Sequence, residues 1–223
     1  MSKYKRLEVL NRIIDAGMVP LYYNSDLEVM KKVIKACYDG GATIFEFTNR
    51  GDFAHEVFKE LNKWVIKEYP EMILGVGSVV DAGTCSIYIQ LGTHFIVSPL
   101  LNSDMAKICN RRKVAWIPGC GSVSEIGMAE ELGAEIVKVY PANTLGGAKF
   151  IKNILAPCPW SQLMPSGGVE AEYDNLKSWF DAGACCVGIG SALFSKEMIK
   201  KGDFSALEEK VREVISMIKK IKK

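Results

Sequence analysis

The 223-residue sequence has no apolar run long enough to cross a membrane, and its first residues lack the apolar segment of a signal peptide. Histidine is scarce: only His55 and His94 occur, far apart in the chain, which argues against a histidine-based metal site. Neither sign of charge is in excess, because 28 Lys and Arg face 26 Asp and Glu. We therefore expect a cytoplasmic protein with no metal, no nucleic acid and no membrane among its partners.

Cysteine occurs seven times, but without the pattern of a disulfide framework or a zinc site. The number is odd, the positions are scattered through mostly apolar runs, and no Cys-x-x-Cys is found. These features predict reduced thiols, as in a cytoplasmic protein. The adjacent Cys185 and Cys186 allow a redox pair as an alternative, although two small buried strand residues explain them more simply.

Linker sequences and shifts of composition are also missing, so we expect residues 1–223 to form a single domain. Short apolar runs alternate with amphipathic stretches of helical period throughout the chain. Strands are expected at 18–23, 42–48, 72–78, 94–98, 114–118, 135–140, 162–165 and 185–189. Helices are expected at 26–38, 53–69, 82–91, 104–110, 123–132, 147–155, 173–182 and 204–221, with a further helix at 2–16 ahead of them.

Eight β-then-α units predict an α/β protein whose parallel sheet closes into a (β/α)8 TIM barrel with an extra N-terminal helix. An open doubly wound sheet is the alternative, but no Gly-x-Gly-x-x-Gly follows the first expected strand. In a barrel, functional residues come from the carboxyl ends of the strands and the loops that follow. The unusual residues of this chain lie at those positions.

Two charged residues stand alone in apolar runs that are expected to be buried strands. They are Glu46, in Ile-Phe-Glu-Phe-Thr, and Lys138, in Ile-Val-Lys-Val-Tyr. A charge on a core strand is unfavourable unless it has a partner or a chemical task. Desolvation lowers the pKa of a lysine, and a neutral amine attacks a carbonyl to form a Schiff base, with a carboxylate to move protons. The alternatives are an inert ion pair and a Lys138 that points outward to the helices.

Arg50 and two glycine-rich turns add groups that bind anions. Because side chains alternate along a strand, Arg50 shares a face with Glu46, which sets a guanidinium fork for a carboxylate beside the acid. The turns are Ser166-Gly167-Gly168 and Gly188-Ile-Gly190-Ser191, after the last two expected strands. In barrels the backbone N–H groups of such turns commonly hold a phosphate. Tight turns without a ligand are the alternative.

In chain order, the strand ends carry motifs that together resemble the KDPG/KHG aldolase family (2-keto-3-deoxy-6-phosphogluconate aldolase and 4-hydroxy-2-oxoglutarate aldolase). The motifs are Glu46-x-Thr48-x-Arg50, Gly75-x-Gly77-Ser78, Ser98-Pro99, Ile117-Pro118-Gly119, Lys138-x-x-Pro141-Ala142 and Pro165-Ser166-Gly167-Gly168. The resemblance implies a metal-independent class I lyase on a homotrimeric (β/α)8 barrel. It further implies cleavage of a 2-keto-3-deoxy-6-phospho-sugar acid, or of 4-hydroxy-2-oxoglutarate, to pyruvate and an aldehyde such as glyceraldehyde 3-phosphate.

The resemblance also implies a role for each matching residue. Lys138 matches the Schiff-base lysine and Glu46 the general acid/base, and no cofactor is implied beyond the Schiff base itself. Residues at the pyruvate end and at the phosphate end follow in the same way: Arg50, Ser78 and Pro99 for pyruvate, and Ser166, Gly167, Gly168, Gly190 and Ser191 for phosphate.

Three departures from the family's pattern put the exact substrate in doubt and leave the retro-aldol residues in place. Ser78 and Ser166 stand where threonines are usual, Leu100 replaces the glycine after Ser-Pro, and Asn49 is an unusual residue before the arginine. The alternatives are a 2-keto-3-deoxy-6-phosphogalactonate aldolase, an unphosphorylated hydroxy-oxoglutarate aldolase, and a non-catalytic phospho-sugar or keto-acid binding barrel.

Overall fold

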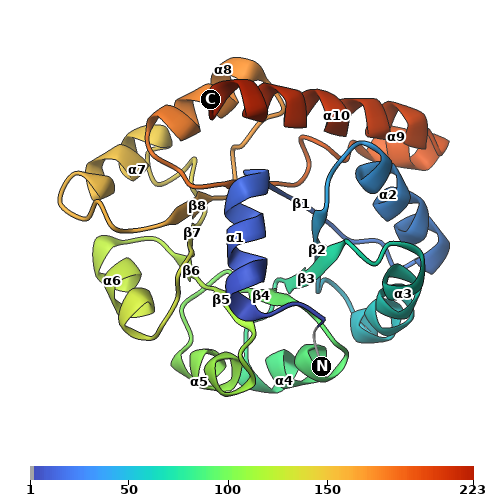
Figure 1. Cartoon of the computed structure of the whole chain (residues 1–223), viewed down its shortest axis with the longest axis horizontal. Helices are drawn as coiled ribbons and strands as arrows, with labels where there is room; N and C mark the ends of the chain where they lie inside the picture. Colours follow the sequence, from blue (N-terminus) through green and yellow to red (C-terminus); the bar gives the residue numbers. More distant parts are fainter. Residues whose placement is uncertain (1–2) are drawn as a thin grey trace.

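The computed structural model of the chain describes residues 3–223, in which strands and helices alternate around a central curled sheet (Figure 1). The strands are β1 Met18–Tyr22, β2 Ile44–Thr48, β3 Ile73–Gly77, β4 Phe95–Val97, β5 Ala115–Ile117, β6 Gly119–Cys120, β7 Val137–Val139, β8 Leu163–Pro165 and β9 Val187–Ile189. The helices are α1 Arg6–Ala16, α2 Leu27–Asp39, α3 Ala54–Glu68, α4 Ala82–Gln90, α5 Ser103–Arg112, α6 Val123–Glu131, α7 Ala148–Leu155, α8 Tyr173–Asp181, α9 Lys196–Lys201 and α10 Phe204–Ile221. The predicted α/β class is confirmed. Ser2, the predicted start of the first helix, lies outside the described residues.

The strands form two parallel sheets that meet at both ends. One has the order β5-β4-β3-β2-β1-β9 and the other the order β6-β7-β8. Between β8 and β9, the Cys185 N–H donates to the Leu163 carbonyl at 3.0 Å, and Ser166 forms a parallel bridge with Gly188. Between β5 and β6 only Pro118 intervenes. Proline has no N–H, so the hydrogen-bonded ladder is interrupted there.

The prediction was wrong at two elements. The strand expected to end at Pro118 resumes after it as β6, because the Pro118 carbonyl still accepts a hydrogen bond from the Lys138 N–H at 2.9 Å. The short helix α9 was not expected at all. Its six residues include no buried side chain, and the Ser195 hydroxyl caps it, so it has no apolar periodicity from which to predict it.

Buried side chains form an outer and an inner cluster, and the inner one shows which way the strand residues face. The outer cluster lies between the sheet and the surrounding helices. The inner cluster lies on the concave side of the sheet and joins Ile44 of β2 and Ile136, which precedes β7, to Val9 and Ile13 of α1. Because strand side chains alternate, a residue two positions beyond Ile44 or Ile136 also faces inward.

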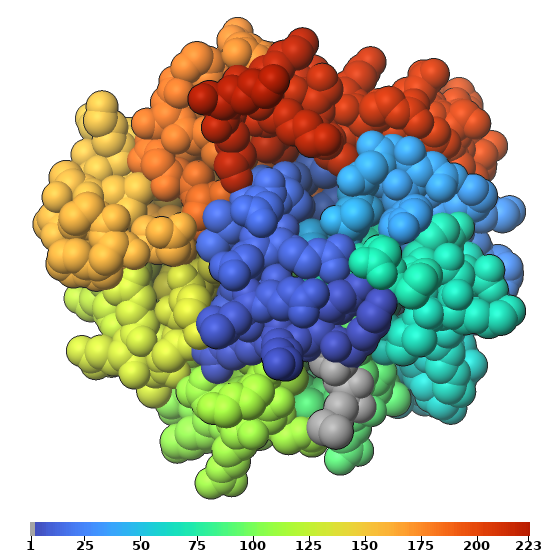
Figure 2. Space-filling view, viewed as in Figure 1, coloured from blue at the N-terminus to red at the C-terminus, as the bar shows by residue number. Residues whose placement is uncertain are grey.

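Helix α1 covers one end of this inner cluster. In Figure 2 it fills the centre of the face toward the viewer, between the elements that surround it. Gly17 ends α1 in the left-handed conformation (φ 69°), and β1 begins at the next residue, so the covered end is the one where strands start. The carboxyl ends of the strands, where a site is expected, therefore lie at the opposite end.

Candidate active site

Glu46 is the charged residue of β2 on the concave side of the sheet, two residues after Ile44. It is buried, with 1% of its surface exposed, and its Oε2 has no hydrogen-bond partner among the described residues. The carboxylate lies directly over Gly77 of β3: a Cβ added to Gly77 would be 1.6 Å from Oε1. Burial raises the pKa of Glu46, and the charges of Lys138 and Arg50 oppose that rise. The carboxyl group is therefore a ready proton acceptor and donor.

Lys138, in the middle of β7, faces the same interior. Its side chain is nearly enclosed, with the residue 7% exposed, and its backbone pairs in register with Gly119 and Met164. Burial lowers the pKa of Lys138; the Glu46 charge opposes this and the Arg50 charge adds to it. The amine is thus closer to its neutral, nucleophilic form than an exposed lysine. The alternative of a Lys138 directed to the helices is wrong, because it follows Ile136 of the inner cluster by two residues.

Glu46 and Lys138 act on each other's charge but do not form a closed ion pair. Each shifts the pKa of the other, so the two strands bring them into one electrostatic environment. None of the ion pairs among residues 3–223 includes either residue. The inert ion pair considered from the sequence is therefore not formed in this part of the chain. Glu46 Oε2 is therefore free to accept a hydrogen bond from a reacting group.

Tyr140 is a site residue that the sequence analysis did not select. Its ring lies 4.6 Å from Lys138 Nζ, a cation–π contact, and 39% of the residue is exposed. The available signal was its position two residues after Lys138, on the same side of the chain. An aromatic face at this distance stabilises positive charge on the nitrogen.

Arg50, Ser78 and Pro99 surround the same strand ends. Arg50 is exposed, and its Nε donates a long hydrogen bond of 3.4 Å to the Ser78 hydroxyl. Ser78 directly follows β3 in the left-handed conformation (φ 58°), which is uncommon for a residue with a side chain. Pro99 lies against Gly119, where an added Cβ would be 2.5 Å from the Pro99 carbonyl. Since Gly119 is the register partner of Lys138, Pro99 lies near the lysine. Ser78 follows Gly77, over which Glu46 lies, and the Arg50 charge acts on both Glu46 and Lys138.

The glycine-rich turns after β8 and β9 lie side by side. An added Cβ at Gly188 would be 3.2 Å from the Ser166 hydroxyl oxygen. Gly167 and Gly168 both adopt positive φ (91° and 77°), and the described residues offer their N–H groups no acceptor. Gly190 and the exposed Ser191 follow β9 directly. Two adjacent turns with free N–H groups and a hydroxyl form a suitable cradle for an anion.

Comparison with known proteins identifies the family. A family model described as KDPG and KHG aldolase matches residues 9–210. The chain belongs to the KDPG and KHG aldolase family. It is therefore an aldolase, a carbon–carbon lyase, and the resemblance read from its strand ends is confirmed. The non-catalytic binding barrel considered from the sequence has no support.

Three similar proteins match this aldolase over nine-tenths or more of their length. A protein named 2-dehydro-3-deoxy-phosphogluconate aldolase from Pseudoalteromonas atlantica is 30% identical, over 97% of this chain and 98% of that protein. A KHG/KDPG aldolase from Escherichia coli is 28% identical, over 89% of this chain and 90% of that protein. A crystal structure of KDPG aldolase from Legionella pneumophila, with pyruvate captured as a covalent carbinolamine, superposes with a TM-score of 0.82 at 25% identity, over 91% of this chain and 96% of that one.

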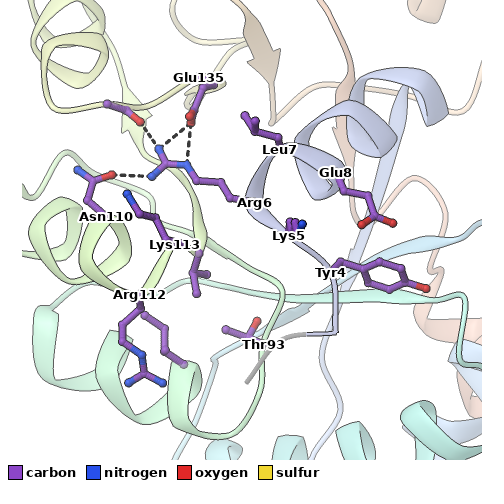
Figure 3. A pocket seen from close by; sticks show the side chains of 13 residues that line it. Tyr4, Lys5, Arg6, Leu7, Glu8, Thr93, Asn110, Arg112, Lys113 and Glu135 are labelled. Atoms are coloured by element: carbon purple, nitrogen blue, oxygen red, sulfur yellow. Dashed lines mark hydrogen bonds and ion pairs between the residues drawn. The ribbon is translucent and has the colours of Figure 1, made fainter.

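A separate pocket of about 810 Å³ lies beside the start of α1, near the loops that lead into β5 and β7 (Figure 3). Arg6 lies in it and is held by the side chains of Asn110 at 2.6 Å and Glu135 at 2.7 Å and by the Gly133 carbonyl. None of the candidate site residues lines this pocket. Asn110, Gly133 and Glu135 bind Arg6 at the start of α1, and neither Glu46 nor Lys138 lines this pocket. We therefore place the chemistry at Glu46 and Lys138.

Three further findings concern metal ions, membrane-spanning helices and cysteines. Residues 3–223 contain no group of three or more His, Cys, Asp or Glu that could hold a metal ion. Within the same range, no helix is both long and apolar enough to cross a membrane. All seven cysteines are free thiols, including the adjacent Cys185 and Cys186.

Proposed function

We propose that this aldolase cleaves a 2-keto-3-deoxy-6-phospho-sugar acid, or 4-hydroxy-2-oxoglutarate, to pyruvate and an aldehyde through a Schiff base on Lys138. The proposal rests on one observation: Lys138 and Glu46 are both buried and form no ion pair with each other. Burial lowers the pKa of Lys138 and raises the pKa of Glu46, which favours the neutral form of each. The Legionella relative, captured with pyruvate as a covalent carbinolamine, gives independent support for covalent chemistry in the family.

The proposed reaction begins with the neutral amine of Lys138. It attacks the C2 carbonyl of the substrate to give a carbinolamine, which takes up a proton, loses water and becomes an iminium ion. Glu46 then takes the proton of the C4 hydroxyl as the C3–C4 bond breaks, and the bonding electrons move into the enamine. The aldehyde leaves. Glu46 returns the proton to C3, and water hydrolyses the resulting pyruvate iminium to release pyruvate, the neutral amine and the proton taken up at dehydration.

The remaining residues bind and orient the substrate in this proposal. The Arg50 guanidinium, steadied by Ser78, holds the carboxylate of the pyruvyl group, and Pro99 lines its apolar side. Tyr140 stabilises the positive nitrogen of the iminium. Ser166, Gly167, Gly168, Gly190 and Ser191 hold the phosphate at the far end. None of these steps requires a metal ion or another cofactor.

We extend the proposal to architecture and setting. β5 and β6 act as one strand interrupted at Pro118, and the β8–β9 contacts join the two sheets, which supports a closed (β/α)8 barrel with α1 as an added helix. Residues 1–223 then form a single domain. The family resemblance supports a homotrimer, which light scattering after gel filtration can test. The free cysteines support a cytoplasmic location.

The experiment is a turnover assay on a panel of 2-keto-4-hydroxy acids with coupled detection of pyruvate. The panel contains the gluconate and galactonate epimers of the phosphorylated sugar acid and unphosphorylated 4-hydroxy-2-oxoglutarate. We expect pyruvate release from at least one phosphorylated member and its loss in Lys138→Ala. Full activity of Lys138→Ala, or no pyruvate from any member, would refute the proposal.

A further inference from the structure

A hydrogen bond between two residues outside the described chemistry holds the strand end that carries Arg50. The hydroxyl of Tyr88, on α4, donates to Asn49 Oδ1 at 2.7 Å. Asn49 directly follows β2 and immediately precedes Arg50. Asn49 faces the helices, where Tyr88 lies, whereas Glu46 faces the concave side. The hydrogen bond therefore fixes the end of β2 from the side of the sheet that faces the helices. The Arg50 charge acts on both Glu46 and Lys138, so the arginine lies toward the site.

Asn49 is also fixed through its backbone. Its N–H donates to the carbonyl of Gly77 at 2.8 Å, and the N–H of Arg50 donates to the Thr48 carbonyl at 2.9 Å, so the chain bends at this point. Gly77 is followed by Ser78, whose hydroxyl accepts the hydrogen bond from Arg50 Nε. Asn49 thus connects α4 and the end of β3 to the backbone of Arg50.

Tyr88 is itself rigidly placed, so it can fix the position of Asn49. It is fully buried, and its ring packs edge-on against Phe58 of α3 with centroids 5.2 Å apart. Burial raises the pKa of Tyr88, with a smaller contribution from Tyr23, so the hydroxyl stays protonated and donates. A phenylalanine would fill the same space. A buried hydroxyl is unfavourable without a partner, and Asn49 is the partner that the described residues provide.

We propose that Tyr88 is a positioning residue that, through Asn49, sets the place of Arg50 and so the affinity for the substrate carboxylate. This inference rests on the proposed function, in which Arg50 holds that carboxylate. The arginine side chain is exposed, and among residues 3–223 its one hydrogen bond is the 3.4 Å bond to Ser78, so its own contacts define its place weakly. If the backbone of Arg50 were less well fixed, the guanidinium would bind a carboxylate less tightly, because a bidentate pair requires a fixed geometry.

The test compares Tyr88→Phe with the wild-type enzyme. Losing one buried hydrogen bond should raise KM for the keto-acid substrate by about three- to tenfold and leave kcat within about twofold. Asn49→Ala removes the same bond from the other side and should have the same effect, and the double variant should equal either single one. In an Arg50→Ala background, Tyr88→Phe should raise KM no further. Because Asn49 is only half-buried, its variant provides the test if Tyr88→Phe does not fold.

Thr93→Val is the matched control. Thr93 is buried beside the start of β4 and donates a hydrogen bond of 2.9 Å to the Phe95 carbonyl, at the end of the strands away from the site. Its loss should lower Tm comparably and leave KM unchanged. If KM of Tyr88→Phe stays at the wild-type value, or rises equally in the Arg50→Ala background, the inference is overturned. Wild-type enzyme that borohydride fails to trap with pyruvate would instead overturn the proposed function.

Discussion

An alanine at position 77 would occupy the place of the Glu46 carboxylate. Its Cβ would lie 1.6 Å from Glu46 Oε1 and 2.4 Å from the carboxyl carbon, whereas ordinary van der Waals contact begins near 3.4 Å. The carboxylate must therefore move by about 2 Å, judged by the difference between those two separations. A displacement of about 1 Å from the productive geometry can slow a reaction by about 100-fold. We expect Gly77→Ala to lower kcat by at least about 100-fold, an increase of about 3 kcal/mol in the barrier.

The assay combines turnover with covalent trapping. Steady-state pyruvate release measures the loss in kcat, and borohydride reduction with saturating pyruvate reports on Lys138. The three atoms nearest to the added methyl group all belong to Glu46. Gly127→Ala is the control, because a Cβ added to that glycine of α6 meets nothing within 4 Å. We expect it to retain wild-type kcat and to be slightly more stable than the wild type.

A double variant decides whether the carboxylate is the cause. If Gly77→Ala acts by displacing Glu46, then adding it to Glu46→Gln should cause little further loss, because the group it displaces is already disabled. The reasoning would be refuted by a Gly77→Ala enzyme with kcat within threefold of wild type. It would be refuted equally by losses that multiply in the double variant.

Three further predictions concern the lysine, the distal turn and α1. The Tyr140 ring stabilises the cation of Lys138, so Tyr140→Leu should lower the pKa of that lysine further. The acid limb of kcat/KM should then move to lower pH by about half to one pH unit, and Tyr140→Phe should leave it in place. A shift to higher pH would contradict this prediction. Gly168 has a positive φ, and a Cβ added to it would lie 2.4 Å from Asn143 Cβ. Gly168→Ala should therefore raise KM for the phosphorylated substrate and leave the pyruvate concentration for half-maximal trapping unchanged. Equal losses in both assays would argue against a role of this turn at the phosphate end. Arg6→Ala removes the hydrogen bonds to Asn110 and Glu135, so it should lower the free energy of unfolding by about 1–3 kcal/mol, measured as a fall in Tm of several degrees. Because Arg6 lies in the pocket away from the site, kcat should stay unchanged.

The period of the sequence was sufficient to predict most strands and helices and the two buried charges. Alternation of side chains predicted that Glu46 and Arg50 share a face, and for Glu46 this holds because Ile44, two residues earlier in β2, joins the inner cluster. Arg50 lies beyond the end of β2, where alternation no longer applies. The orientation of Lys138 stayed open until the structure assigned Ile136 to that cluster too. A single sequence cannot settle such a choice when every neighbour on both faces is apolar.

Contacts that depend on the register between strands were beyond prediction. That Glu46 lies over Gly77 follows from the pairing of β2 with β3, and a shift of one residue would point every side chain to the other face. The hydrogen bond from Tyr88 to Asn49 spans 39 residues and joins a helix to a strand end. Neither residue carries a local signal of the contact, although Asn49 stood out as unusual for the family.

The measurement closest to the central claim is borohydride reduction of the wild-type enzyme in the presence of pyruvate, followed by peptide mass analysis. The account predicts that the peptide containing Lys138 gains the mass of pyruvate less one water plus two hydrogens, and that Glu46→Gln forms this adduct more slowly. An unmodified Lys138, or the same adduct on another lysine at equal yield, would contradict it.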